Sequence, residues 1–451
     1  MLIQGAQVAL PGARQLEPRD LRIQDGKITE IAEHLEPLPG EEVLDATGRW
    51  IFPGGIDPHV HFDTPGYTHR EDFQHASRAA AAGGITTVID MPCTSVPPVT
   101  SRANLEAKLE AVADQSVVDF GFHGGVSGKT FEERFPHNLH ELREAGVFGI
   151  KTYLISGMET FPRVTLFQLE RILEVARDLD LVVLLHAEDY DYVSSATAYF
   201  RQIGDGPWYF YRSRPEAAEL LAIQAAVALA RRRRAPLHIV HVGTAEAVEI
   251  IKTAETVTCE TAPHYLAFGL EDLQRIGAPL KTTPPVKPSA NRWGLWYHLA
   301  RGNILYVASD HAPAPAEEKN TPSFWQAYSG IPGVQTLFPY LLSEGLLAGR
   351  LSLSRFLEAI AEGAARRFGL DHRKGSLEVG KDADLVIVNP EATWTLQVDT
   401  SFYSKGKITP FEGMTFRGKI EKTLVRGRVV YDHQQGIVAP SGWGQFLRRT
   451  P

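Results

Sequence analysis

Side chains that can bind metal ions follow several short apolar segments of the chain. His59 and His61 are alternate residues of one extended segment, so both point to the same side and can reach one ion. Other apolar segments are followed by Lys151, His186, His241 and Asp310. A single His-x-His pair is weak evidence, because most histidines are ordinary core or surface residues. Imidazoles combined with a carboxylate are ligands for zinc, iron or manganese, so the whole set predicts a site for one or two ions.

Lys151 needs a separate explanation, because an ammonium group would be repelled by two cations. The structural alternative is a lysine whose stem packs on the protein while its head reaches a carboxylate. Lys151 lies in the apolar run Gly149–Leu154, however, where burial favours the neutral amine. A neutral amine can add carbon dioxide and become a carbamate, an anion with two oxygens that can bridge a pair of metal ions.

The apolar segments alternate with helical patterns, which predicts parallel βαβ units. Eight strands would close into a (β/α)8 TIM barrel, where reacting groups lie at the carboxyl ends of the strands. An open doubly wound sheet is disfavoured, because no Gly-x-Gly-x-x-Gly motif follows the first strand. The predicted strands are Gly55–Pro58, Thr86–Asp90, Val117–Phe122, Val147–Leu154, Leu181–Leu185, Leu237–Val240, Thr256–Cys259 and Ile304–Ala308.

Short segments of alternating polarity at both ends of the chain predict one small β domain. Leu21–Gln24 and Lys27–Ile31 flank Asp25-Gly26, a pair typical of a hairpin turn. We therefore predict an α/β protein in which residues 53–365 form the barrel. A small β-sandwich domain is built from both termini, with residues 1–52 as its N-terminal part and residues 366–451 as its C-terminal part.

Composition limits the partners. The chain has 451 residues, 43% of them hydrophobic and 22% charged, which is typical of a globular protein with a sizeable core. Its net charge of −8 offers no positive field, so neither nucleic acid nor a membrane is expected as a partner. Two cysteines outside any Cys-x-x-Cys pair, and a start without a basic and apolar leader, predict a cytoplasmic protein.

Several motifs resemble those of the cyclic amidohydrolases, which include dihydroorotase, allantoinase and hydantoinase (dihydropyrimidinase). The resemblance implies a binuclear centre, with zinc expected, held by the four histidines above, carboxylated Lys151 and Asp310. It implies that a hydroxide bridging the ions attacks a ring carbonyl, while Asp310 moves the proton to the departing nitrogen. It also implies a homodimer or homotetramer. The motifs are Pro53–His61, Ala79–Thr87, Gly149–Lys151, His238–His241, Ser309–Pro313 and Gly380–Leu385.

The residues expected near the ring separate these activities. Proteins that resemble dihydroorotase supply an Arg, an Asn and a His for the substrate carboxylate, where this chain has Asp63, Cys93 and Ala314. A charged hydrogen bond is worth about 1.5–3 kcal/mol, so an aspartate in place of the arginine disfavours dihydroorotate. Hydantoinases have a Tyr five residues after the modified lysine, where this chain has Ser156.

The segments Asp90–Pro98 and Phe324–Tyr328 are more similar to allantoinase, whose neutral substrate needs amide-type partners. We therefore predict a metal-dependent hydrolase that opens a cyclic amide or ureide ring and resembles allantoinase, with dihydroorotase and hydantoinase/dihydropyrimidinase as alternatives. A non-catalytic scaffold of the same fold is disfavoured, because all six ligand positions hold competent residues. The predicted ring contacts, for which ordinary loop turns are the alternative, are Asp63, Cys93, Thr94, Ser156, Ser329, Gly330 and Ile331.

Overall fold

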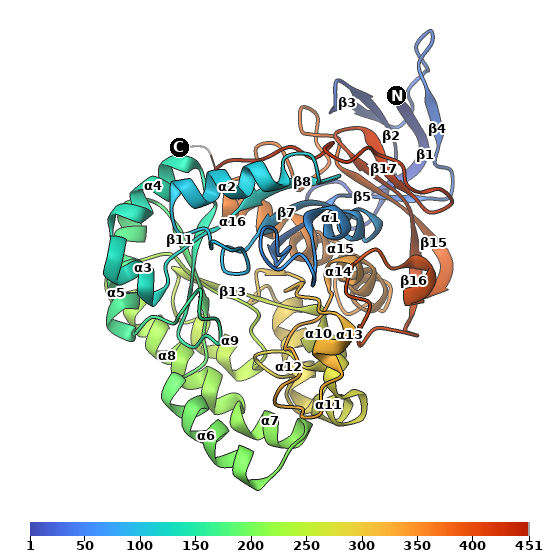
Figure 1. Cartoon of the computed structure of the whole chain (residues 1–451). Helices are drawn as coiled ribbons and strands as arrows, with labels where there is room; N and C mark the ends of the chain where they lie inside the picture. Colours follow the sequence, from blue (N-terminus) through green and yellow to red (C-terminus); the bar gives the residue numbers. More distant parts are fainter. Residues whose placement is uncertain (450–451) are drawn as a thin grey trace.

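All the predicted barrel strands are present in the computed structural model, which describes residues 1–449 (Figure 1). Their ladders run in the orders β6-β7-β8 and β14-β13-β12-β11-β10-β9, and Val60 pairs with His311 to join β6 to the segment after β14. The predicted (β/α)8 barrel is confirmed. Its strands are β6 (Gly55–Val60), β7 (Ile85–Asp90), β8 (Asp119–Phe122) with β9 (Gly124–Gly125), β10 (Gly149–Tyr153), β11 (Val182–His186), β12 (Leu237–Ile239), β13 (Val257–Thr261) and β14 (Tyr306–Val307). Only His123 separates β8 from β9, and the two segments together form one of the eight strands.

Helices cover the outside of the barrel, and side-chain caps fix where several of them begin. Asp72 accepts a hydrogen bond from the backbone of His75 at the start of α1 (Phe73–Ala82), and Thr165 and Gln168 form a capping box on α5 (Leu166–Asp178). The other helices of the barrel region are α2 (Arg102–Val112), α3 (Gly128–Arg134), α4 (His137–Ala145), α6 (Tyr190–Ile203), α7 (Pro207–Ser213), α8 (Glu216–Arg233), α9 (Ala245–Ile251), α10 (Pro263–Ala267), α11 (Leu270–Ile276), α12 (Ser289–Ala300), α13 (Ala316–Lys319), α14 (Val334–Tyr340), α15 (Leu353–Leu357) and α16 (Gly363–Phe368).

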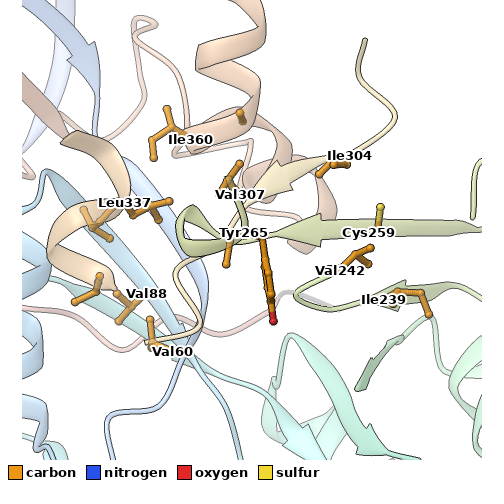
Figure 2. Close-up of a cluster of buried hydrophobic side chains, with 14 of the residues drawn as sticks. Val60, Val88, Ile239, Val242, Cys259, Tyr265, Ile304, Val307, Leu337 and Ile360 are labelled. Carbon is orange, nitrogen blue, oxygen red and sulfur yellow. The ribbon is translucent and has the colours of Figure 1, made fainter. Parts of the chain in front are cut away.

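Two apolar layers result from the alternation of side chains along the strands. Val183 and Leu185 of β11 belong to the layer between strands and helices, whereas Leu184 belongs to the cluster inside the barrel. Figure 2 shows part of the outer layer, where Cys259 of β13 and Val307 of β14 belong to the same buried cluster as Leu337 of α14. Because both layers are buried, the strands are fixed in register and the residues at their carboxyl ends are held in place.

One sheet contains strands from both ends of the chain, so the predicted β domain is confirmed. Phe52 of β5 pairs with Val386 of β15, which joins the N-terminal and C-terminal parts, and Asp25-Gly26 turns the β2–β3 hairpin with positive φ at both residues. The domain boundaries at 52/53 and 365/366 stay a prediction. The strands of the sheet are β1 (Leu2–Val8), β2 (Glu17–Gln24), β3 (Lys27–Ala32), β4 (Val43–Asp45), β5 (Trp50–Pro53), β15 (Leu385–Thr395), β16 (Thr415–Val425), β17 (Arg428–Asp432) and β18 (Gly436–Ile437).

The segment that follows the sheet returns to the barrel. The backbone N–H of Phe120 in β8 donates to Gln445 (3.0 Å), and Leu447 donates back to Phe120 (2.7 Å). On its other side, Arg449 donates to the carbonyl of Gly146 (2.9 Å), just before β10. Residues 445–449 therefore lie between β8 and β10 at the amino-terminal end of the barrel. No helix within residues 1–449 combines the length and apolar character needed to cross a bilayer.

Candidate metal centre

The predicted metal ligands meet at the carboxyl-terminal end of the barrel. His59 lies in β6 and His61 directly follows it, Lys151 lies in β10 and His186 ends β11, while His241 and Asp310 follow β12 and β14. Ligand atoms of His59, His61 and Asp310 all lie within 4.8 Å of one another. The Oδ1 atom of Asp310 is 3.2 Å from Nε2 of His59 and 3.5 Å from Nε2 of His61.

His59 connects this group to the remaining ligands. Its ring centroid is 5.5 Å from that of His241, and Nε2 of His241 is 2.9 Å from Nδ1 of His186. Nζ of Lys151 lies 4.9 Å from the ring centroid of Tyr153, a ring that stacks on His186. The six side chains therefore form one continuous, largely buried cluster.

Some polar atoms of this cluster have no partner. Within the described chain, Nζ of Lys151 and Nδ1 of His241 are buried and make no hydrogen bond. Buried polar atoms are almost always satisfied, so such atoms indicate a ligand that completes them. Imidazoles, a carboxylate and a buried amine are a donor set that fits divalent metal ions. Burial also lowers the pKa of Lys151 to about 8, which makes the neutral amine accessible near neutral pH.

The buried carboxylate Glu260 orients two histidines of the site. Its Oε1 contacts Nδ1 of His59 in a short hydrogen bond, and its Oε2 lies 3.2 Å from Nε2 of His238. Burial opposes ionisation of Glu260, but His59 and His238 outweigh it and hold the pKa of this carboxyl well below its usual range. A carboxylate on the far side of a ligand histidine fixes the ring and makes it a better donor. Sequence analysis missed Glu260, although it directly follows the apolar run Thr256–Cys259.

A second carboxylate, Glu188, holds His186. Its Oε2 is 2.9 Å from Nε2 of His186 and accepts a hydrogen bond of 2.5 Å from Nη1 of Arg214. Burial works against the charge, but Arg214 and His186 together lower the pKa of Glu188 to about 2. Glu188 and Arg214 were not among the predicted site residues, and no local pattern in the sequence connects them.

The backbone beside the ligands is strained. His241 and Asp310 have positive φ values of 41° and 49°, which residues other than glycine rarely adopt. Oδ1 of Asp57 accepts the backbone N–H of Ser309 (3.1 Å) and so ties β6 to the segment that carries Asp310. Strain of this kind persists only where the surrounding structure enforces it, as here around the cluster.

A cavity of about 360 Å³ opens over the cluster. Five of the predicted ring contacts line it, namely Cys93, Thr94, Ser156, Ser329 and Gly330. Asp63 and Ile331 do not line it, and both are buried behind its wall. The wall also contains residues that were not predicted as ring contacts, namely Tyr153, Arg214, Thr282, Thr283 and Tyr328.

Some lining residues also have structural roles. Oγ of Ser156 donates to the carbonyl of Phe161 (2.8 Å), which is the hydrogen bond of a loop turn. Sγ of Cys93 lies 3.0 Å from Oη of Tyr153, within the site itself. The ring-contact role of the lining residues stays a prediction.

A comparison with models of protein families matches residues 50–430 to the amidohydrolase family. The chain belongs to the amidohydrolase family. This amidohydrolase is 36% identical to an allantoinase from Deinococcus radiodurans over 98% of its own length and 97% of that protein's. It is 38% identical to an allantoinase from Solibacter usitatus, over 99% and 96% of the two chains.

Solved structures agree with this assignment. An L-hydantoinase (dihydropyrimidinase) from Arthrobacter aurescens superimposes with a TM-score of 0.93 at 31% identity, over 99% of both chains. A dihydropyrimidinase from Brevibacillus agri superimposes with a TM-score of 0.92 at 30% identity, over 100% of this chain and 98% of that one. The amidohydrolase is thus a hydrolase of cyclic amide C–N bonds that resembles allantoinase, as predicted, in a family whose members use a binuclear metal centre.

Proposed function

We propose that this amidohydrolase opens the ring of allantoin by hydrolysing a ring amide bond. The observation that carries the proposal is that the ligand cluster lies at a cavity in a chain similar over its whole length to allantoinases. Apart from the proposed metal ligands and Arg214, most polar side chains of the cavity wall carry neutral hydroxyls, including those of Thr282, Thr283 and Tyr328. Such a wall suits a neutral ureide better than an anionic ring.

We infer that two zinc ions fit the cluster. His59, His61 and Asp310 would hold one ion, His186 and His241 the other, and carboxylated Lys151 both. The unpartnered Nζ of Lys151 and Nδ1 of His241 support this assignment. When bound, such ions lower the pKa of a coordinated water and polarise a carbonyl oxygen.

Asp310 is the catalytic residue of the proposal. Burial opposes its charge, but His59 and His61 outweigh burial and hold the pKa of Asp310 well below its usual range. The carboxylate is therefore unprotonated at neutral pH, which is the state required of a group that accepts the proton of the attacking water and passes it to the ring nitrogen that departs. Glu260 and Glu188 keep the histidines around it in fixed orientations.

A panel of cyclic amides tests the proposal. The protein, supplied with zinc and bicarbonate, is assayed with allantoin, dihydroorotate, dihydrouracil and hydantoin. We expect allantoin to have the highest kcat/KM, and preferential turnover of dihydroorotate would contradict the proposal. Metal analysis should find two ions per chain, whereas a non-catalytic scaffold would hold none.

We further propose that the protein acts in the cytoplasm as a homodimer or homotetramer. Cys93 and Cys259 are free and buried, which supports a reducing compartment. Large apolar side chains are exposed on α6, including Tyr199 and Ile203, and such side chains support self-association. Gel filtration with light scattering measures the assembly state.

A further inference from the structure

Arg214 is the one arginine or lysine that lines the cavity within the described chain. It directly follows α7, and 18% of its side chain is exposed. Its contact Glu188 lies against His186, so the guanidinium is two hydrogen bonds away from the ligand cluster. Arg214 and the cluster line the same cavity, so a ring held at the cluster can place a substituent against Arg214.

The pose of Arg214 is fixed from two directions. Nη1 donates to the fully buried Glu188. The backbone carbonyl of Arg214 accepts a hydrogen bond of 2.9 Å from Nζ of Lys287, which is itself 3.0 Å from the carboxylate of Glu219. A side chain anchored in this way loses little further freedom when it binds a ligand.

One edge of the guanidinium is left for a ligand. A guanidinium has five N–H donors in a planar fork, and the side-chain hydrogen bonds of Arg214 within residues 1–449 use Nη1 alone. Nε and Nη2 therefore form an intact edge with two parallel donors, which fits a carbonyl or a carboxylate. Because Glu188 already pairs with Arg214, the guanidinium attracts a second anion less strongly, and a neutral carbonyl can occupy this edge.

We propose that Arg214 determines substrate specificity by donating from this edge to a carbonyl on the substituent of the ring. In allantoin this acceptor is the carbonyl of the ureido group, so the inference rests on the proposed function and adds the recognition of the substituent. A purely structural role, in which Arg214 only balances the charge of Glu188, would affect every ring to the same extent.

Kinetics of Arg214→Gln separate the two roles. We measure KM and kcat with allantoin, and the inhibition constant of hydantoin, which has the same ring without the ureido group. We expect kcat/KM for allantoin to fall about 10- to 100-fold, the loss of one charge-assisted hydrogen bond. The inhibition constant of hydantoin should change less than about twofold, and the zinc content measured by mass spectrometry should stay the same.

Arg212→Gln is the matched control. The guanidinium of Arg212 lies 5.3 Å and 5.6 Å from the ring centroids of Phe200 and Trp208, and the residue does not line the cavity. This variant should keep both constants. Arg214→Lys retains the positive charge but loses the planar edge, so it should fold, as measured by circular dichroism, and still discriminate poorly.

Three outcomes would overturn the inference. Equal weakening of allantoin and hydantoin together with loss of zinc would mean that Arg214 acts only through Glu188 and His186. Unchanged kinetics with allantoin would show that Arg214 makes no contact with the ureido group. If the inhibition constant of dihydroorotate, measured in the same way as that of hydantoin, rises alone, Arg214 binds a carboxylate instead. If the wild-type protein turns over no allantoin, the proposed function itself fails, and this result is distinct from the other three.

Discussion

Two groups of buried charged side chains differ in how their polar atoms are satisfied. At the junction of barrel and β-sandwich, Nζ of Lys374 lies 2.7 Å from Asp119, 3.1 Å from Asp382 and 2.6 Å from Asp384. Further donors reach these carboxylates, including the backbone N–H of Gln445 on Asp119 (2.9 Å). In the metal centre, by contrast, Lys151 faces no carboxylate partner within hydrogen-bond reach among the described residues.

Residue types alone would not separate the two groups. In both groups, atoms that could bind a metal ion lie within 4.8 Å of one another. These atoms belong to Asp119, Asp382 and Asp384 at the junction, and to His59, His61 and Asp310 in the candidate metal centre. At the junction the space between the carboxylates is filled by Lys374, which makes the group a structural ion cluster. Between these two groups, unsatisfied hydrogen-bonding capacity rather than composition distinguishes the candidate metal centre from the ion cluster.

The largest expected effect is on catalysis at the metal centre. Asp310→Asn removes the proton acceptor, and we expect kcat for allantoin to fall about 10²- to 10⁴-fold. Because Asp310 is also a proposed metal ligand, stability is compared in the metal-free proteins, where the free energy of unfolding should change by less than about 1 kcal/mol. Steady-state kinetics and urea denaturation measure the two quantities, with the exposed Asp178→Asn as control. Nearly normal turnover would contradict the assigned role.

The junction should respond in the opposite way. Lys374→Met leaves three buried carboxylates without their shared cation, and we expect a loss of about 3–5 kcal/mol in the free energy of unfolding. The kcat of the folded fraction should stay the same. Urea denaturation compares this variant with Lys252→Met, a change at an exposed lysine of α9's C-terminus. Equal stability of the two variants would show that the cluster does not hold the domains together.

Metal removal tests the comparison directly. Dialysis against a chelator should abolish turnover while circular dichroism still shows a folded protein. Restoring zinc to about 100 times its dissociation constant should raise the free energy of unfolding by about 2.7 kcal/mol for each ion that binds independently. Native mass spectrometry should count two ions per chain. If the wild-type protein binds a third ion and Asp384→Asn does not, the junction also binds a metal, and the two groups of charged side chains do not differ as stated.

The smallest expected effect concerns a buried lysine that has carbonyl partners only. Nζ of Lys319 donates to Ala278 (3.0 Å) and Gly330 (2.5 Å), and burial lowers the pKa of Lys319 to about 7. Above that pH the unfolded chain binds one more proton at this lysine than the folded chain does, because an unperturbed lysine stays protonated to about pH 10.4. Wild-type stability relative to Lys319→Met should therefore rise by about 1 kcal/mol between pH 7 and 8. Denaturation curves at both pH values measure it, and a falling difference would contradict the assigned shift.

The sequence predicted most of the barrel and the meeting of six proposed ligands at one end of it for one physical reason. Parallel strands bring their carboxyl ends to one rim, so a local pattern of apolar run and polar residue also gives the position in space. Glu260 follows the same rule, because it comes directly after the predicted strand Thr256–Cys259. The positions of His186 and Glu260 at strand ends can thus be predicted from the same sequence pattern.

The remaining features depend on contacts between distant segments. Arg214 reaches the cavity because Glu188 and Lys287 hold it there, and nothing in its own segment indicates this. Asp63 was predicted to face the ring, but it does not line the cavity. Its backbone has a positive φ of 55°, a conformation that the spacing of residues in the sequence does not reveal. The conformation of the loops is therefore the part of the site that could not be predicted from the sequence.

The return of residues 445–449 to the barrel has a consequence for how the chain folds. Gln445 contacts Asp119, a residue 326 positions earlier, and Leu447 enters the cluster inside the barrel. Contacts of such long sequence separation form late, because the entropy of closing so large a loop must be overcome first. In a nascent chain that has not yet reached this segment, the edges of β8 and β10 at the amino-terminal end of the barrel would stay uncovered, although β9 already pairs with β10. An excised barrel would expose the same edges to aggregation.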